Sequence, residues 1–308
     1  MAEPRKPVMP PVRRPPERPS AKQLRTRRLV AALVFVVVVA AGVGIAFAAM
    51  GRGGSSAPAT TAALPPPPKP LRIIFPEGFT IAQMAQRITA VDRIARRKRH
   101  VNPKLRATQY LKLTRNAPFP PGFGHTRGKL EGFLFPATYD FLEQTTTKQL
   151  VADQLKAFRE SWAKLDLRYA RSKNLTPYDV LIIASMVEKE TLAPDERPLV
   201  ASVIYNRLHA HMPLGIDATI RYGLNVPGTQ ALRESQLSST SPYNTRKFAG
   251  LPPTPIANPG LASMQAAAHP RKTKYLYFVR KPDKVHHFFT SSEAEFFRKA
   301  CEYGYGCG

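Results

Sequence analysis

The chain has 308 residues, of which 43% are hydrophobic, which is enough for one medium-sized core with accessory segments. Its formal net charge of +25 is typical of proteins that meet nucleic acid, an anionic membrane or an anionic polymer. The sequence contains no zinc-finger spacing, RNP-like aromatic motif or P-loop, so nucleic acid is not expected as a partner.

The first 70 residues predict a membrane anchor and its flanking segments. Residues 1–28 are rich in Pro and Arg and predict a disordered, basic cytoplasmic tail. Residues 29–50 carry no charge and as a helix would reach roughly 33 Å, the thickness of a bilayer core. The basic flank at Arg25–Arg28 predicts a single-pass protein of the cell membrane with its N-terminus in the cytoplasm. A cleaved signal peptide is the alternative, since Ala46–Ala48 reads A-x-A, but the apolar run and the basic tail are both long for one.

Residues 51–70 predict a Pro/Gly/Ser-rich linker, and residues 71–120 a small accessory module. In the module, LRIIF from Leu71 predicts a strand, and Thr80–Ile88 predicts a helix with Thr80 as its N-cap. The basic stretch Arg87–Arg115 is either a solvated face or a contact surface for anionic wall polymers or lipid headgroups.

Residues 121–308 predict an α+β main domain, because several helices precede a β-hairpin. The two cysteines, Cys301 and Cys307, lie in a Gly-rich tail and could close a small loop in an oxidising compartment. The expected helices are Lys148–Leu167, Thr176–Thr191, Glu196–His211 and Ser291–Ala300, and the expected strands are Tyr275–Arg280 and His286–Thr290.

Two carboxylates, Glu188 and Glu190, end the apolar helix predicted over Thr176–Thr191. A carboxyl group at the end of a buried helix is desolvated, which raises its pKa. A carboxylic acid that is protonated near neutral pH is what cleavage of a glycosidic bond requires. From this segment alone, the simpler interpretation is that both are surface residues or members of structural ion pairs.

Other polar residues fit a sugar-binding cleft only as a group. Asn206, Asp217 and the segment Ser241–Arg246 (SPYNTR) would each singly be caps, turns or surface residues. Amide, carboxylate and aromatic groups together are what a glycan cleft uses. His269, His286 and His287 have no close-spaced ligand motif and are expected either to be structural or to support a neighbouring site residue, so no metal or cofactor is predicted.

Several long motifs, in order, resemble the endolytic murein transglycosylases of the MltG or YceG-like family. The resemblance covers about residues 130–290, and more loosely residues 73–88. The matching motifs are LEGFLFPATYDF from Leu130, IIASMVEKET from Ile182, ERPLVASVIYNRL from Glu196, SPYNTR from Ser241, GLPPTPIANPG from Gly250, AAAHPRKTKYLYFV from Ala266 and HHFFT from His286.

This resemblance implies a lyase that cuts between N-acetylmuramic acid and N-acetylglucosamine within nascent strands and leaves 1,6-anhydro ends. It implies that Glu190 is the single catalytic residue and that no metal takes part. Penicillin-binding peptidoglycan synthases are implied as candidate partners. The residues expected to line the cleft are Asn206, Asp217, Tyr243 and Asn244.

The resemblance also has departures and leaves alternatives. Ala137 stands where the family often has an acidic residue, and the LysM-like module before the main domain is shortened. One alternative is a non-catalytic glycan-binding scaffold for peptidoglycan synthases, which the intact E-K-E-T segment argues against. Another is a hydrolase that uses water, for which Asp217 or Glu131 would be the second carboxylate.

Overall fold

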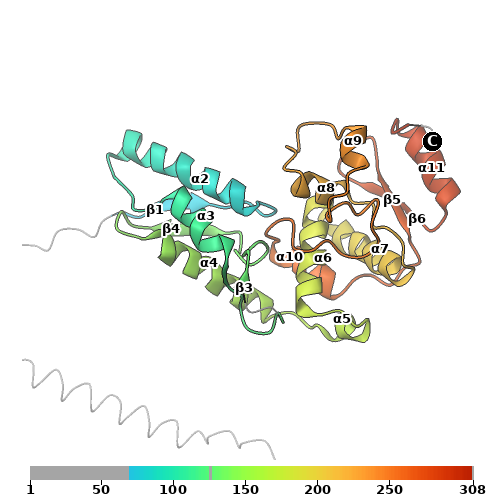
Figure 1. The fold of residues 1–308 in the computed structure, drawn as a ribbon, viewed down its shortest axis with the longest axis horizontal. Coiled ribbons are helices and arrows are strands. Elements are labelled where there is room, and N and C mark those ends of the chain that lie inside the picture. Colours follow the sequence, from blue (N-terminus) through green and yellow to red (C-terminus); the bar gives the residue numbers. More distant parts are fainter. Residues whose placement is uncertain (1–68, 125–126, 307–308) are drawn as a thin grey trace, which may run out of the picture. The chain divides into compact units, whose positions relative to one another are not determined.

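The computed structural model describes residues 69–124 and 127–306 (Figure 1). The predicted cytoplasmic tail (1–28), the predicted membrane helix (29–50) and nearly all of the linker (51–70) lie outside the described residues. Within the described ranges, no helix has both the length and the apolar character needed to span a bilayer.

A two-stranded antiparallel sheet organises the first part of the fold. Strand β1 pairs with β4 in the register Leu71↔Phe141 to Ile74↔Thr138. Between them in the chain lie the helices, which begin with the predicted cap: Thr80 Oγ1 accepts from the Gln83 N–H, and the Gln83 side chain accepts from the Thr80 N–H. The elements are β1 (Leu71–Ile74), α2 (Ile81–Ile94), η1 (Ala95–Arg99), α3 (Ala107–Arg115) and β4 (Thr138–Phe141).

The expected boundary near residue 120 falls inside this arrangement, because β4 lies after it and completes the sheet of β1. The intervening chain forms a short pairing of β2 (Ala117–Pro118) with β3 (Arg127–Gly128). Helix α4 (Thr147–Trp162) then packs on α3. The Pro- and Gly-rich residues 118–124 were expected to separate two domains. Strands β1 and β4, which lie on either side of these residues in the sequence, pair with each other and join the two segments in one sheet.

Three helices form the centre of the second part. Helix α6 (Pro177–Glu190) packs against α7 (Arg197–His209) and α10 (Leu261–Ala268), as Figure 1 shows. Its residues from Val180 to Val187 are all buried, as the continuous apolar run predicts. The shorter helical segments are α5 (Arg168–Ser172), η2 (Pro194–Glu196), α8 (Asp217–Gly223) and α9 (Glu234–Leu237).

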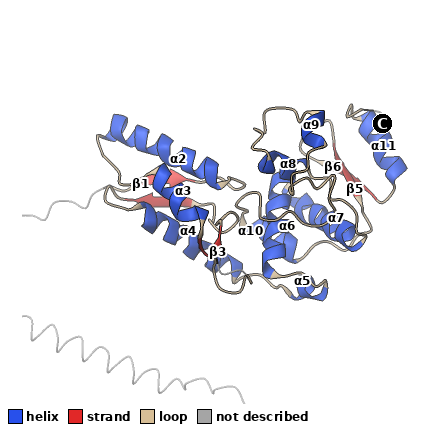
Figure 2. Cartoon of the chain, in the orientation of Figure 1, coloured by secondary structure: helices blue, strands red, loops and turns tan. Residues whose placement is uncertain are grey.

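The predicted hairpin and closing helix complete the fold. Strands β5 (Tyr277–Arg280) and β6 (His287–Thr290) pair antiparallel, and α11 (Glu293–Glu302) follows with Ser292 as its N-cap. Cys301, in the last turn of α11, is disulfide-bonded. Helices and small antiparallel sheets occur together (Figure 2), so the α+β class is confirmed.

Candidate functional site

Helix α6 fixes the position of Glu190, its last residue. At the N-terminus of the helix, Thr176 Oγ1 accepts from the Asp179 N–H, while Asp179 Oδ2 accepts from the Thr176 N–H at 2.8 Å. Pro177 occupies the first helical position, where it costs no hydrogen bond. At the other end, the Thr191 N–H and hydroxyl both donate to the Val187 carbonyl. The capped and buried helix therefore holds Glu190 at a defined place.

The Glu190 carboxyl group is desolvated and still accessible. The residue is half-buried, and its carboxyl accepts no hydrogen bond from a described residue. Burial raises its pKa from 4.5 to about 7. A carboxyl group whose pKa lies near the working pH can both donate and accept a proton.

Some charged neighbours raise the pKa of Glu190 and others lower it. Arg280, Lys189 and Arg221 lower its pKa, while Asp217 raises it, and these effects are smaller than that of burial. Arg280 also donates from Nη2 to the main-chain carbonyl of Glu190 at 3.3 Å. The site thus joins the end of α6 to strand β5 and to helix α8.

A buried Glu196–His287 pair lies beside the hairpin of β5 and β6. His287 is opposite Arg280 in the hairpin register, and its N–H donates to both carboxylate oxygens of Glu196 at 2.9 and 3.1 Å. The His287 Nδ1 lies 2.7 Å from Glu196 Oε2. Burial is the main cause that lowers the pKa of His287. The contacts of His287 with Glu196 therefore tie the start of α7 to β6, the strand that pairs with β5.

Glu188 has a different environment from Glu190. Its Oε2 accepts the N–H of Gly260, the N-cap of α10, at 2.9 Å. The carboxylate therefore joins the end of α6 to the start of α10. Of the two glutamates, Glu188 has a hydrogen-bonded structural contact, and Glu190 has a carboxyl group that is open to a ligand.

The residues predicted to line the cleft differ in their exposure and in their hydrogen bonds. Asp217 begins α8, and its carboxylate accepts from Arg246 Nε at 2.6 Å while remaining 43% exposed. Tyr243 is half-buried, and its hydroxyl lies 2.8 Å from that of Thr254. Asn206 donates from Nδ2 to the carbonyls of Thr273 and Tyr275.

Asn244 is fully buried, so its side chain does not line an open surface. Its Nδ2 donates to the carbonyls of Leu237 and Ser239, each at 2.8 Å, and its Oδ1 accepts from the Arg246 N–H. This corrects the expectation that Asn244 faces the cleft: the amide instead folds the loop that carries Tyr243 and Arg246. A polar side chain in a turn satisfies nearby backbone groups when no solvent reaches it.

A second buried carboxylate, Glu131, connects the two parts of the fold. It is fully buried, and it accepts from the N–H of Ile81 at the start of α2, from Asn258 Nδ2, and from the Tyr222 hydroxyl on α8. Lys129 Nζ lies 3.4 Å away. Burial raises the pKa of Glu131 despite these partners. A carboxylate enclosed in this way has no face for a water nucleophile, which removes one of the two candidates for a hydrolytic mechanism.

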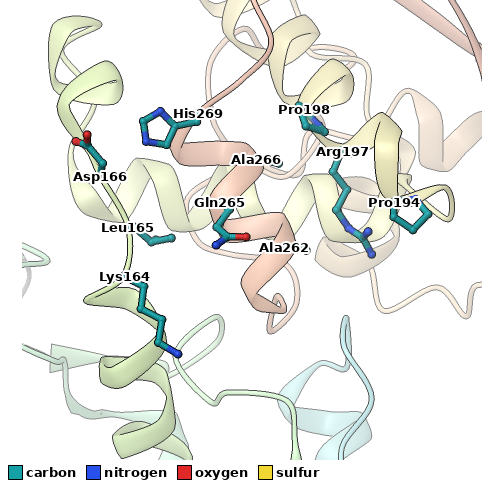
Figure 3. Close-up of a pocket in the computed structure, with 10 residues that line it drawn as sticks. All are labelled: Lys164, Leu165, Asp166, Pro194, Arg197, Pro198, Ala262, Gln265, Ala266 and His269. Carbon is teal, nitrogen blue, oxygen red and sulfur yellow. The ribbon is translucent and has the colours of Figure 1, made fainter.

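A pocket of about 480 Å³ lies elsewhere, between α10, the start of α7 and the turn after α4 (Figure 3). Gln265, His269 and Arg197 are among its lining residues, and neither Glu190 nor any predicted cleft residue is. The reactive carboxyl, and not the size of this pocket, therefore defines the candidate site. Within the described residues, no group of three or more His, Cys, Asp or Glu side chains is placed to hold a metal ion.

Sequence reasoning missed the cations around Glu190. Arg280 ends an apolar strand and Arg221 lies in a short helix that was not predicted, so neither stands in a recognisable pattern. Asn258 was also missed as a functional position, although it is fully buried and bonded to Glu131. Its motif, GLPPTPIANPG, was the only signal that could have pointed to it.

Comparisons with known proteins identify the family of this chain. A model described as "YceG-like family" matches residues 52–302. The endolytic murein transglycosylase of Streptococcus pneumoniae (strain ATCC BAA-255 / R6) is 32% identical over 248 residues, which are 75% of this chain and 44% of that protein. The endolytic murein transglycosylase of Bacillus subtilis (strain 168) is 39% identical over 152 residues, which are 49% of this chain and 42% of that protein.

A solved structure is also similar. The crystal structure at 2.6 Å of the yceG-like protein lmo1499 from Listeria monocytogenes matches with a TM-score of 0.58 and 30% identity, over 73% of this chain and 74% of that one. The chain spans less than half the length of the curated relatives it matches.

Proposed function

The chain belongs to the YceG-like family, and we propose that it is a lytic endotransglycosylase that cuts the glycan strands of peptidoglycan. The observation that carries this proposal is the Glu190 carboxyl group, half-buried, without a hydrogen-bond donor among the described residues, and with its pKa raised to about 7. The names of the two relatives, both called endolytic murein transglycosylase, support the same chemistry.

In the proposed reaction Glu190 serves as both acid and base. Its protonated carboxyl gives a proton to the glycosidic oxygen between N-acetylmuramic acid and N-acetylglucosamine, and the bond from that oxygen to C1 breaks. The carboxylate then takes the proton of the C6 hydroxyl of the same muramoyl residue as that oxygen attacks C1. The products are a 1,6-anhydro end and a free hydroxyl on the leaving sugar, and Glu190 is protonated again.

An intramolecular nucleophile explains why one carboxylate suffices. The attacking hydroxyl is already attached to the reacting ring, so neither a bound water nor a second catalytic carboxylate is needed. The positive charges of Arg280 and Arg221 counteract the desolvation of Glu190 and keep its pKa near neutrality. A carboxyl with a much higher pKa would be a poor base in the second half of the reaction.

We place the glycan along the surface that Asp217 and Tyr243 border. Asp217 is partly exposed and its charge acts on Glu190, and the half-buried Tyr243 ring packs edge-on against that of Tyr222. Asn206 donates a hydrogen bond to the main chain just before β5, and Asn244 donates to the main chain near Tyr243 and so stabilises that loop.

The cellular setting is proposed from the sequence. Residues 29–50 would anchor the protein in the cell membrane with its N-terminus in the cytoplasm, and the strand–helix–helix–strand arrangement from β1 to β4 would be a LysM-like module. The enzyme would trim or terminate nascent strands beside penicillin-binding peptidoglycan synthases.

Product analysis tests the reaction directly. Nascent peptidoglycan is incubated with the full chain in detergent, and the glycan ends are identified by mass spectrometry. The proposal expects 1,6-anhydro ends with the wild-type chain and with Glu188→Gln, and none with Glu190→Gln. Reducing ends would indicate hydrolysis, the absence of cleavage by a folded wild-type chain would indicate a scaffold, and unchanged cleavage by Glu190→Gln would exclude Glu190 as the acid.

A further inference from the structure

The C-terminal end of α2 and the following η1 segment form a strongly cationic surface. Within the seven residues 93–99, five side chains are Arg or Lys, and all five are exposed. Arg96 pairs with Asp92 at 3.0 Å, and none of the other four forms an ion pair with a described residue. Four cations without partners repel one another, so this arrangement favours an anionic partner.

An exposed apolar residue lies within this cationic run. Ile94 is 54% exposed, although it is one of the largest apolar side chain types. It lines a pocket of about 370 Å³ together with Leu71, Val91, Ala95 and the cationic Arg99. Ile94 thus adds an apolar side chain to the cationic surface. Apolar side chains surrounded by Lys and Arg are typical of surfaces that lie in the headgroup region of a membrane.

This surface is also where the described chain begins. Pro70, only the second described residue, lines the same pocket. Nineteen residues, 51–69, separate Pro70 from the proposed membrane helix, a length that spans at most about 70 Å when fully extended. A weak surface contact held this close to a bilayer is formed more often than the same contact free in solution.

We propose that this surface, which we call the α2 tip (Pro70, Leu71, Val91 and residues 93–99), docks on the anionic phospholipid headgroups of the membrane that anchors the chain. The cations contact phosphate groups, and Ile94 enters the interface between headgroups and acyl chains. The inference rests on the proposed anchor at residues 29–50. Docking would limit the positions that Glu190 can take above the bilayer and so favour strands that are still close to the membrane.

Anionic wall polymers are the competing partner, and Ile94 distinguishes the two. A soluble polyanion binds the cations and releases counterions, and it has no use for an exposed isoleucine. A bilayer uses both the charges and the apolar side chain.

The test uses the full chain in nanodiscs made of phosphatidylcholine alone or with added phosphatidylglycerol. Hydrogen exchange over residues 91–99 is followed by mass spectrometry. The proposal expects this segment to exchange more slowly in the anionic discs. Arg97→Gln/Lys98→Gln/Arg99→Gln should remove the difference, because the loss of three cations weakens headgroup binding by roughly a hundredfold. Ile94→Ser should reduce it.

The matched control is Lys148→Gln/Lys156→Gln/Arg159→Gln, which removes the same charge from exposed positions on α4 and should leave the difference intact. The proposal would be overturned if the segment exchanged equally in both kinds of disc. It would also be overturned if the control variant lost the difference between the discs as fully as the variant of residues 97–99. Protection by a soluble polyanion without protection by anionic discs would assign the surface to wall polymers instead. Retention of the chain in the discs at high salt, measured on the same samples, tests the proposed membrane anchor independently. Glycan cleavage by the same samples tests the proposed enzyme activity independently.

Discussion

Exchange of Glu190 for glutamine removes a carboxyl group whose ionisation the fold opposes. The pKa of Glu190 is raised from 4.5 to about 7, so the native state favours the protonated form. The contribution of the protonated Glu190 to the stability of the native state is fully present below pH 4.5 and is lost as the pH rises through about 7. A shift of this size corresponds to about 3 kcal/mol, and screening by solvent at this half-buried carboxyl reduces it to about 1–2 kcal/mol. Relative to wild type, the free energy of unfolding of Glu190→Gln should therefore rise by that amount between acidic and alkaline pH.

Urea unfolding of the full chain in detergent measures this difference. The chain has one tryptophan, Trp162, which packs against Phe123 and Phe158, so its fluorescence reports on the core of the described fold. Wild type and variant are compared at about pH 5 and about pH 8, on either side of the raised pKa. Glu188→Gln is the control, and it should show no gain at alkaline pH, because the Glu188 carboxylate already accepts the Gly260 N–H. If the gap between Glu190→Gln and wild type were the same at both pH values, Glu190 would not be a desolvated acid.

Four further substitutions test the surroundings of the site. Arg280→Gln removes a charge that lowers the pKa of Glu190, so the alkaline limb of the pH profile of kcat/KM should move to higher pH. Glu131→Leu removes the acceptor of two buried donors, Ile81 N–H and Asn258 Nδ2, and of the half-buried Tyr222 hydroxyl, and should lower the free energy of unfolding in urea by about 3 kcal/mol. Gly132→Ala should lower the free energy of unfolding, measured with urea, by about 2–4 kcal/mol, since Gly132 has φ +90° and the new Cβ would lie 2.8 Å from Pro255. Thr176→Ala loses the cap of α6 and should cost about 1 kcal/mol in the same assay, without a change in the pH profile.

Local patterns in the sequence determined the main helices and their ends. The capping box at Thr176 and the apolar run that follows it predicted α6 within one residue at its start, and the hairpin of β5 and β6 was also predicted. These features depend on neighbours close in the sequence, because a helix cap is satisfied within its own segment and the two strands of a hairpin pair across a short turn. The position of Glu190 at the end of a buried helix follows from the same local pattern, which by itself did not separate Glu190 from Glu188.

The tertiary structure alone decided which side chains meet. Asn258 reaches Glu131 across 127 residues of chain, and Arg280 reaches the Glu190 carbonyl across 90. The same packing buries Asn244, which the family resemblance had placed in the cleft. The physical reason is that a buried polar group must find its partner wherever the folded chain brings one, and that partner need not lie nearby in the sequence. Sequence thus determined where the acid stands, and the packing of distant segments decided what surrounds it.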